Sequence, residues 1–341
     1  MTDILTAGVI GAGRIGKVHA ATLAYRIPAA RLLAIADIDL PAAQRLAAQF
    51  CIPTATADYR EVLDNPEIDA VLICSSTDSH ARFIEEAALA GKHIFCEKPI
   101  AHSLAEIDHS LAAVAAAGVK LQVGFNRRFD ANFRRVRDAV ERGEIGQPAL
   151  LHIISRDPAP LPMAYVKVSG GMFLDMTIHD FDMARFLIDA EVEEVYVQAA
   201  VTVDPAIGEA GDVDTAVIML KFANGVIGTI DNCRRASYGY DQRVEVFGSK
   251  GAVSTINNYP NAAIISDGAS VRRDLPLNFF MDRYTESFVA EMLAFVDAVL
   301  HDRPVPVTGR DARVPVVMAL AAGKSLRQGR PVKLSEIDGG M

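Results

Sequence analysis

A glycine-rich turn near the start of the chain constrains the fold more than any other feature. The stretch GVIGAGRIGKVHA, residues 8–20, sets glycines in a G-x-G-x-x-G spacing directly after the apolar run ILTAGVI. The first glycine allows a tight turn, the second lets the backbone approach a pyrophosphate, and the third lets helix and strand lie close together. The following helix N-terminus offers N–H groups and a positive dipole end to phosphates. We predict a dinucleotide site rather than a mere turn, formed by Gly11, Gly13, Arg14, Ile15 and Gly16.

An acidic residue follows the next apolar run. Asp37 ends the stretch AIAD and lies 21 residues beyond Gly16, where a carboxylate can accept hydrogen bonds from the adenosine ribose. The alternative is a solvated loop acid. No arginine in ADIDLPAAQ is available for a 2′-phosphate, and the acids there would repel one. The pattern therefore favours NAD over NADP.

The first 120 or so residues alternate short apolar runs with helices. Examples are AVLICSS, residues 70–76, and HARFIEEAALAG, residues 80–91. Uninterrupted apolar strands between helices indicate a parallel sheet covered on both faces. We predict a doubly wound α/β Rossmann domain over residues 1–123.

The pattern changes from about Pro148. Longer alternating strands such as TAVIMLKF, residues 215–222, and QRVEVFGS, residues 242–249, follow one another with glycine turns and no helices between them. This is typical of an open, mostly antiparallel sheet. We predict an α+β domain over residues 124–341 for substrate binding and oligomerisation, with the last helix packed back on the first domain.

Composition excludes several classes of protein. The net charge of −9 gives no basic excess to neutralise nucleic-acid phosphates or to bind an anionic membrane surface. No apolar run approaches the roughly 20 residues that span a bilayer, and the start does not resemble a signal peptide. The four cysteines form no CxxC pair, which favours reduced thiols in a cytoplasmic protein over a disulfide frame or a zinc site.

Two polar stretches follow apolar strands, and the carboxyl ends of such strands line the ligand crevice of a Rossmann domain. The first stretch, CSSTDSH, either contacts the edge of the cofactor or is a polar loop that caps the next helix. Its candidate cofactor-binding residues are Ser75, Ser76, Thr77 and His80. The second, CEKPI, contains Glu97 and Lys98. Lys98 either points towards the ligand or forms a surface salt bridge with its neighbour, and this stretch leaves both readings open.

A further polar group lies in the apolar stretch GGMFLDMTIHDFDMARFL, residues 170–187. Asp175 and His179 are four apart and would share one face of a helix. Metal ligation is disfavoured, because no cysteine, further histidine or HExxH motif accompanies them. A buried structural histidine is the alternative to a proton-transfer pair. The glycine pair 170–171 and the density of titratable groups favour proton transfer.

Taken together, the chain resembles the family of glucose–fructose oxidoreductase and inositol dehydrogenase, and is most similar to its bacterial inositol 2-dehydrogenase branch. The resemblance rests on GAGRIGKVHA, CEKPI, GFNRRFDANF, SRDP, SGGMFLDMTIHDFDMARF and YGYDQRVEVFGSKG. It implies NAD at the carboxyl edge of a Rossmann sheet, oxidation of a cyclic polyol hydroxyl to a ketone in carbohydrate catabolism, and subunits paired through their sheets, commonly as a tetramer.

The resemblance also implies site residues. Lys98, Asp175 and His179 match the catalytic positions of the family, and further residues match segments that contact substrate: Asn126, Arg127, Asp157, Tyr238 and Tyr240. His179 is the natural general base around neutral pH, Asp175 can orient its imidazole, and Lys98 can hold the substrate oxygen. The sequence leaves open an exchange of roles between His179 and Lys98. An aldose 1-dehydrogenase, an NAD-dependent glycosidase and a non-catalytic NAD sensor are the alternatives.

Overall fold

The computed structural model describes residues 4–339, which form two compact units. The N-terminal unit comprises the chain up to residue 129 together with residues 286–314. The C-terminal unit comprises residues 130–285 and the chain from residue 315 onward. The chain therefore leaves the first unit, builds most of the second, and returns to the first for residues 286–314. It then ends in the second unit.

The N-terminal unit is built on a six-stranded parallel sheet in the order β3-β2-β1-β4-β5-β6. Its strands are β1 (Leu5–Ile10), β2 (Ala30–Ala36), β3 (Thr54–Thr56), β4 (Ala70–Ile73), β5 (His93–Glu97) and β6 (Leu121–Gly124). Its helices are α1 (Arg14–Arg26), α2 (Leu40–Phe50), α3 (Arg60–Leu63), α4 (Thr77–Leu89), α5 (Leu104–Ala117) and α12 (Thr285–Leu300). The strand order reverses between β1 and β4, which is where such sheets bind ligands.

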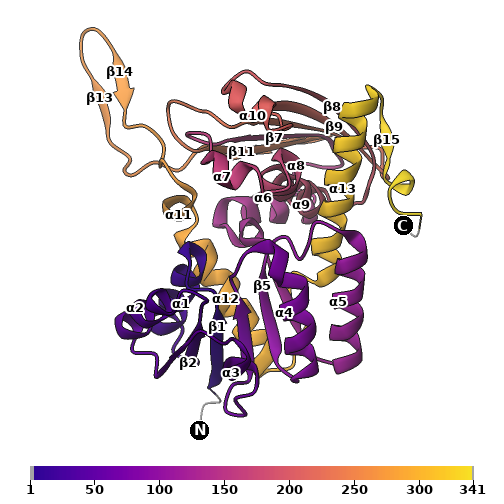
Figure 1. Ribbon diagram of the computed structural model, residues 1–341. Helices are drawn as coiled ribbons and strands as arrows, with labels where there is room; N and C mark the ends of the chain where they lie inside the picture. The colour runs from indigo at the N-terminus through magenta and orange to yellow at the C-terminus, as the bar shows by residue number, and fades with distance from the viewer. Residues whose placement is uncertain (1–3, 340–341) are drawn as a thin grey trace. The chain divides into compact units, whose positions relative to one another are not determined.

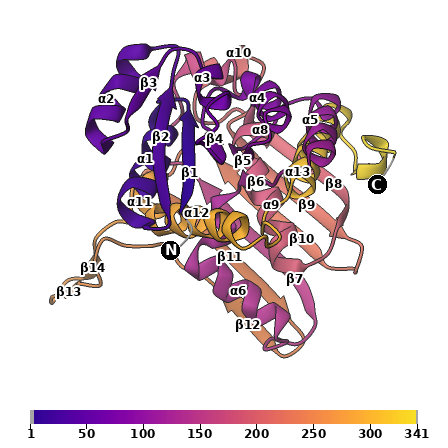
Figure 2. The same cartoon turned by 90° about the horizontal axis from the view of Figure 1, so that it is seen from below.

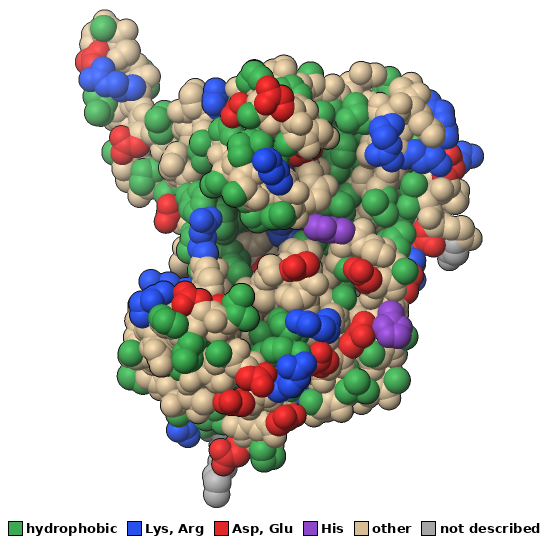
Figure 3. Space-filling view, viewed as in Figure 1, with side chains coloured by type: hydrophobic (Ala, Val, Ile, Leu, Met, Phe, Trp, Pro, Cys, Tyr) green, Lys and Arg blue, Asp and Glu red, His purple; other side chains and the backbone are tan. Residues whose placement is uncertain are grey.

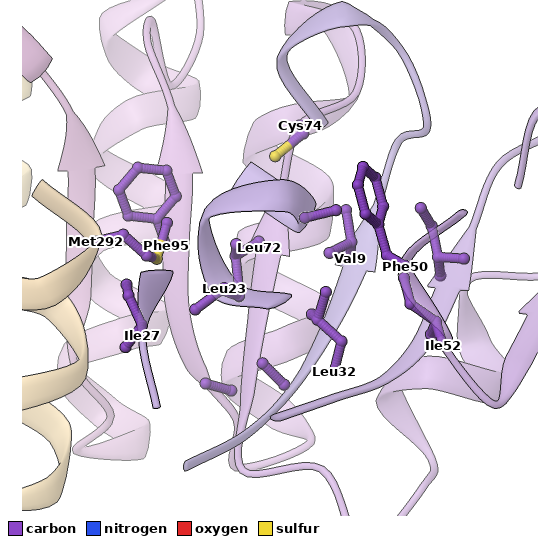
Figure 4. Packing of buried hydrophobic residues seen from close by; sticks show 14 of the residues in the cluster. Val9, Leu23, Ile27, Leu32, Phe50, Ile52, Leu72, Cys74, Phe95 and Met292 are labelled. Atoms are coloured by element: carbon purple, nitrogen blue, oxygen red, sulfur yellow. The ribbon is translucent and has the colours of Figure 1, made fainter. Parts of the chain in front are cut away.

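One hydrophobic cluster joins three helices to the same face of this sheet. Leu23 and Ile27 of α1, Phe50 of α2 and Met292 of α12 lie against strand residues that include Phe95 (Figure 4). Helix α12 follows six of the seven strands of the second sheet along the chain, and it completes a core begun by the first hundred residues. Helices α4 and α5 lie on the opposite side of the sheet (Figure 1).

The C-terminal unit contains a seven-stranded mixed sheet in the order β12-β11-β7-β10-β9-β8-β15, in which β7 and β10 are parallel and the other neighbours are antiparallel (Figure 2). The strands are β7 (Pro148–Arg156), β8 (Val192–Ala200), β9 (Thr215–Phe222), β10 (Ile227–Cys233), β11 (Asp241–Gly248), β12 (Gly251–Ser254) and β15 (Val332–Lys333). The predicted fold class, a Rossmann domain followed by a mostly antiparallel α+β domain, is confirmed.

Helices cover one face of this second sheet. Helix α9 (Thr177–Ile188) contacts β7 and β10, and α6 (Ala131–Glu141) contacts β11 and α9. The unit also contains α7 (Met163–Val166), α8 (Met172–Asp175), α10 (Pro205–Glu209), α11 (Phe280–Arg283) and most of α13 (Gly309–Gln328). Short 3-10 turns lie at Asn126–Phe129 in the N-terminal unit and Leu334–Glu336 in the C-terminal unit.

A hairpin arm, β13 (Ile264–Ser266) with β14 (Val271–Arg273), extends from the C-terminal unit, and both strands are exposed along their length (Figure 1). Figure 3 shows basic and apolar side chains together on this arm. Nothing in the sequence pattern predicts it, because neither strand is longer than three residues. Between residues 4 and 339, no helix combines the length and the hydropathy needed to cross a membrane.

Candidate active site

The glycine loop has the geometry that a dinucleotide requires. A Cβ atom on Gly11, whose φ is +108°, would lie 2.6 Å from the carbonyl carbon of Cys74. One on Gly16 would lie 1.9 Å from the carbonyl oxygen of Gly11, so the start of α1 can approach the turn only without a side chain there. At Gly13, by contrast, no described atom lies within 4 Å of the Cβ position, which leaves room for a ligand. The residues fit a bound pyrophosphate.

Asp37 follows β2 at the same edge and fixes the loop. Its Oδ2 accepts a hydrogen bond from the N–H of Ala12 at 2.6 Å, and its Oδ1 accepts one from the N–H of Asp39 at 2.8 Å. The carboxylate thus lies beside the glycine turn and the strand end, where the ribose of a dinucleotide is expected. It retains acceptor capacity, because an ionised carboxylate has about four lone-pair sites.

The stretch after β4 contains both exposed and buried candidates. Ser76 is the N-cap residue of α4 but its side chain makes no cap hydrogen bond, and Thr77 begins the helix. The hydroxyls of Ser75 and Ser79 lie 2.7 Å apart. His80 is buried: its Nδ1 lies 2.8 Å from the carbonyl oxygen of Pro99 and its Nε2 lies 3.0 Å from that of Ser75. The geometry gives His80 a structural role, since its ring ties the end of β4 to the residue after Lys98.

Lys98 directly follows β5, at the carboxyl edge of the N-terminal sheet, and is partly buried. The preceding Glu97 points into the face covered by α1, where its Oε1 lies 2.6 Å from Nε2 of the fully buried His19. Gly124 on β6 allows this carboxylate to approach, because a Cβ there would lie 3.1 Å from Oε2 of Glu97. Glu97 therefore has a structural partner, and its predicted contact with the cofactor stays a prediction.

A second carboxyl lies beneath the same strand end. Glu291 of α12 is fully buried, and neither of its carboxylate oxygens has a hydrogen-bond partner among the described residues. Burial and, to a smaller extent, the negative charge of Glu97 raise the pKa of Glu291 well above its ordinary value. Burial and Glu97 likewise raise the pKa of the Cys96 thiol. The surroundings of Glu291 therefore oppose its ionisation.

In the C-terminal unit, the expected single helix over residues 170–187 is wrong. The chain forms two helices, α8 and α9, which meet at Met176 with φ −97° and ψ −59°. Helix α8 starts after Gly171, whose φ is +85°, and its first N–H, that of Met172, donates to Oδ1 of Asp212 at 3.0 Å. Because the two helices are anchored separately, a spacing of four residues does not by itself place Asp175 and His179 on one face.

Asp175 has partners that the sequence analysis missed. Its Oδ2 accepts a hydrogen bond from Nη1 of the fully buried Arg234 at 3.1 Å, and its Oδ1 accepts one from the hydroxyl of Tyr165 at 3.0 Å. Arg234 is preceded by the stretch IGTIDNC, whose alternation places Asn232 on the buried face. Continuing that alternation by one step identifies Arg234 rather than Arg235 as the buried arginine, so the signal was present.

Helix α9 is fixed to the sheet by buried polar contacts. Thr177 donates to Oδ1 of Asn232 at 2.6 Å, and the amide of Asn232 donates to Oδ2 of Asp180 at 2.8 Å. His179 lies between Thr177 and Asp180 and is partly buried. The first turn of α9, which carries His179, is therefore fixed to β10 on either side of this residue.

The remaining candidates lie in several places. Asn126 and Arg127 are buried in the 3-10 turn after β6 of the N-terminal unit. Asp157 of the C-terminal unit is partly buried; its backbone N–H donates to the carbonyl of Cys233, and its carbonyl accepts from the N–H of Ala236. Tyr240 is nearly buried, with its ring 6.1 Å from that of Tyr284.

Tyr238 belongs to a charged network at the end of β7. It donates to Oδ2 of Asp241 at 2.5 Å and accepts from Nη1 of Arg156 at 3.1 Å. Burial and the bond to Asp241 raise the pKa of Tyr238. Two members of this network, Arg156 and Tyr238, line a pocket of about 470 Å³. Asp231 and Cys233 also line it. Tyr238 thus has structural partners, and its predicted substrate contact stays a prediction.

The residues at these two sites do not form a metal centre. Across residues 4–339, no three histidine, cysteine, aspartate or glutamate side chains are grouped so that they could hold a metal ion. What the N-terminal unit presents is a parallel sheet with the strand order of a Rossmann domain, a glycine loop with room for a pyrophosphate, and an acid at the adjoining strand end. Fold and site define a dinucleotide-binding oxidoreductase.

Comparison with known proteins gives the family. Residues 5–125 match the oxidoreductase family with an NAD-binding Rossmann fold, and residues 133–254 match the GFO/IDH/MocA C-terminal domain. The chain belongs to the GFO/IDH/MocA family of oxidoreductases, as the sequence motifs predicted.

Several relatives match over nearly the whole chain. An uncharacterised oxidoreductase of Bacillus subtilis is 49% identical, with 99% of each chain covered. A myo-inositol 2-dehydrogenase of Thermotoga maritima is 47% identical, with 97% of this chain and 99% of that protein covered. The solved structure of scyllo-inositol dehydrogenase from Lactobacillus casei with bound NAD(H) and scyllo-inositol is 29% identical, with a TM-score of 0.91, and covers 98% of this chain and 100% of that one.

Proposed function

We propose that this protein is an NAD-dependent dehydrogenase that oxidises one hydroxyl of a cyclic polyol, myo- or scyllo-inositol, to the ketone. The observation that carries the proposal is the nearly buried carboxylate of Asp175, held by Arg234 and Tyr165 four residues before His179. A protein that only bound a dinucleotide would have no use for an acid held by a buried arginine at the end of one helix and a histidine on the next helix. Full-length similarity to inositol dehydrogenases supports the same substrate class.

The chemistry assigns roles to three side chains. Bound NAD supplies the hydride acceptor. The side chain of His179 takes the hydroxyl proton, because an imidazole has a reference pKa near 6.5 and can act as a general base around neutral pH. The Asp175 carboxylate stabilises the resulting imidazolium. Lys98, as an ammonium, donates a hydrogen bond to the substrate oxygen and stabilises its developing negative charge. The exchange of roles between Lys98 and His179 remains the alternative within this mechanism.

NAD rather than NADP is the proposed cofactor. The Asp37 carboxylate lies beside the glycine turn and accepts a hydrogen bond from the N–H of Ala12. The 2′-phosphate of NADP would be repelled there, because it carries the same sign of charge as this carboxylate. The next acid, Asp39, is exposed and lies within 3.7 Å of Arg45. Asp37 therefore provides most of the discrimination in this proposal.

Pairing of subunits through the second sheet is the proposed assembly. Phe247, Leu150 and Ile227 lie in register on β11, β7 and β10, and each is about half exposed. Val217 and Met219 of β9 are also about half exposed. This apolar row on an uncovered sheet face, which ends at Lys221 of β9, opposite Ile227, is the signature of a protein–protein contact. We propose a homo-oligomer, a tetramer as the family resemblance implies, in the cytoplasm, where the four free thiols stay reduced.

An initial-rate screen tests the function. Purified protein is mixed with NAD or NADP and with myo-inositol, scyllo-inositol or aldoses such as glucose, and the absorbance of the reduced cofactor is followed. The proposal expects the highest kcat/KM with NAD and an inositol. Faster turnover of an aldose at its anomeric carbon would move the substrate class to sugars, and absence of any reduced cofactor would overturn the proposal.

A further inference from the structure

Arg234 is the least expected side chain in the C-terminal unit. Its guanidinium carries a positive charge at any physiological pH, yet the side chain is 0% exposed. It follows β10 and is oriented by its own backbone, whose N–H donates to the carbonyl of Asp214 at 2.8 Å. A buried charge is tolerated when it is paired, because desolvation of an unpaired ion costs several kcal/mol, on the order of the stability of a whole domain.

Two carboxylates on separate elements meet this guanidinium. Nη1 donates to Oδ2 of Asp175 at 3.1 Å, and Nη2 lies 3.8 Å from Oδ2 of Asp212. The side chains of Asp175 and Asp212 are only 10% and 14% exposed. Nε and Nη2 of Arg234, and Oδ2 of Asp212, have no hydrogen-bond partner among the described residues. The guanidinium therefore makes its one close charged hydrogen bond to Asp175.

The charges of the cluster decide what Arg234 does. Two ionised carboxylates and one guanidinium sum to a single negative charge. Without Arg234, the same cluster would carry two negative charges and no positive one. Tyr165 of α7 also faces Asp175 and donates its hydroxyl to Oδ1, but a phenol brings no positive charge. The titratable side chains of α9 are His179, Asp180, Asp182 and Arg185; Asp180 is bonded to Asn232 and Arg185 to Glu191.

We infer that Arg234 is a positioning residue for the reaction: it fixes the direction of the Asp175 carboxylate and offsets the charge of the two acids, so that Asp175 can stabilise the charged form of His179. The inference rests on the proposed function, in which Asp175 and His179 move the substrate proton. The same guanidinium also links α8 to Asp212, which accepts the N–H of Met172 at the start of that helix.

The chain offers a matched control, because Arg235 is exposed and adjacent in sequence. The variants Arg234→Met, Arg234→Lys and Arg235→Met are assayed with NAD and inositol across the pH range. Arg234→Met is expected to lower kcat by about 10- to 100-fold, as the loss of orienting partners does, and to move the acidic limb of log kcat/KM to higher pH. Arg234→Lys restores the position of that limb, and Arg235→Met behaves as wild type.

A double-mutant cycle with Asp175→Asn separates this role from a structural one. If Arg234 acts through Asp175, then Arg234→Met adds little further loss of kcat in the Asp175→Asn background. Multiplying losses, or an unmoved acidic limb in Arg234→Met, would overturn the inference. Should Arg234→Met fail to fold, Arg234→Met combined with Asp212→Asn restores the single negative charge and is measured in its place, with the same expected loss of kcat through the missing bond to Asp175.

Failure of the inference is distinguishable from failure of the proposed function. If the wild-type protein reduces NAD with inositol and Arg234→Met matches the Arg235→Met control in kcat and pH profile, only the inference fails. If the wild-type protein reduces no cofactor with any polyol, the proposed function fails and the inference fails with it.

Discussion

Nε2 of His19 lies 2.6 Å from Oε1 of Glu97, the residue before Lys98. This contact joins α1, which begins at the glycine loop, to the end of β5 within the N-terminal unit. The imidazole is held by the rings of Phe95 and Phe288, whose centroids lie 4.9 and 5.8 Å from its own. The loop that would hold the pyrophosphate and the strand that presents the lysine are thereby fixed to each other.

The buried acid beside this pair makes stability depend on pH. The pKa of Glu291 in the folded protein lies above its ordinary value of 4.5, because burial and Glu97 oppose its ionisation. Its contribution to stability is therefore complete below about pH 4.5 and is lost as pH rises through the folded pKa. We expect Glu291→Gln, which mimics the neutral acid, to match wild type at acidic pH and to melt at a higher temperature at alkaline pH, by about 2–4 °C for each kcal/mol recovered.

Thermal melts of Glu291→Gln and wild type over a pH series check this prediction. Glu286→Gln is the control, since Glu286 lies on the same helix with a side chain that is 76% exposed. A melting-temperature difference that stays constant from acidic to alkaline pH would show that the pKa of Glu291 is the same in the folded and the unfolded protein.

His80 is expected to stabilise the fold where β4 ends beside Pro99, whether or not it also contacts the cofactor. Replacing it with alanine removes the ring whose two nitrogens lie within hydrogen-bond distance of the carbonyl oxygens of Pro99 and Ser75. The free energy of unfolding should fall by about 1–3 kcal/mol, the cost of leaving a buried polar group without its partner. Chemical denaturation measures it. His109→Ala, at a histidine with a 77% exposed side chain, should change stability by less than about 0.5 kcal/mol. Equal effects of the two substitutions would refute the structural role of His80.

Asp37 is expected to set the cofactor preference. Asp37→Ser removes the charge that opposes a 2′-phosphate, so the ratio of kcat/KM for NAD to that for NADP should fall by at least about tenfold, which is about 1.4 kcal/mol. Asp39→Ser is the matched control, because that carboxylate is exposed beside Arg45. A ratio that changes only in the control would place the discrimination at Asp39 instead.

The apolar row on the second sheet is expected to be an interface between copies of the chain. Leu150 lies in register with both Phe247 and Ile227, and a charge there would be buried in the contact. Leu150→Glu should shift the mass measured by light scattering towards the monomer, whereas Leu89→Glu, at an exposed leucine of α4 in the N-terminal unit, should shift it less. An unchanged mass for Leu150→Glu would mean that subunits pair elsewhere or not at all.

The proposed catalytic residues predict a division between turnover and cofactor binding. Lys98→Met and His179→Gln should each lower kcat by at least about 100-fold, the range for loss of an oxyanion donor or a general base. Binding of NAD, followed by quenching of tyrosine fluorescence or by calorimetry, should persist. Lys167→Met and His301→Gln, at exposed positions, serve as controls. Full activity in both site variants would remove these residues from the mechanism.

Much of this architecture could be predicted because it depends on local pattern. The Rossmann class followed from apolar strands separated by helices, and the glycine spacing located the turn that brings Gly11 against Cys74. Which late helix returns to the first unit could not be predicted in this way: the sequence analysis named the last helix, and it is α12 that completes the first core. Its residue Met292 is apolar like any core residue, and no local pattern states which core a late helix completes.

The proton-transfer segment shows a second limit. The sequence spacing of Asp175 and His179 suggested one helix, but anchors distant in sequence, Asp212 for α8 and Asn232 for α9, divide it at Met176. The buried Arg234 was within reach of the strand alternation that ends at Cys233. Its pairing with an acid 59 residues earlier was not, because pairing depends on tertiary structure.

The most direct test of the account follows the hydrogen itself. Inositol deuterated at the carbon that is oxidised is incubated with the wild-type protein and NAD, and the reduced cofactor and the ring product are analysed by mass spectrometry. The account predicts one deuterium in each NADH, an equal amount of the inositol ketone, and slower turnover than with undeuterated inositol. NADH without deuterium, or ring chemistry with no reduced cofactor, would contradict it.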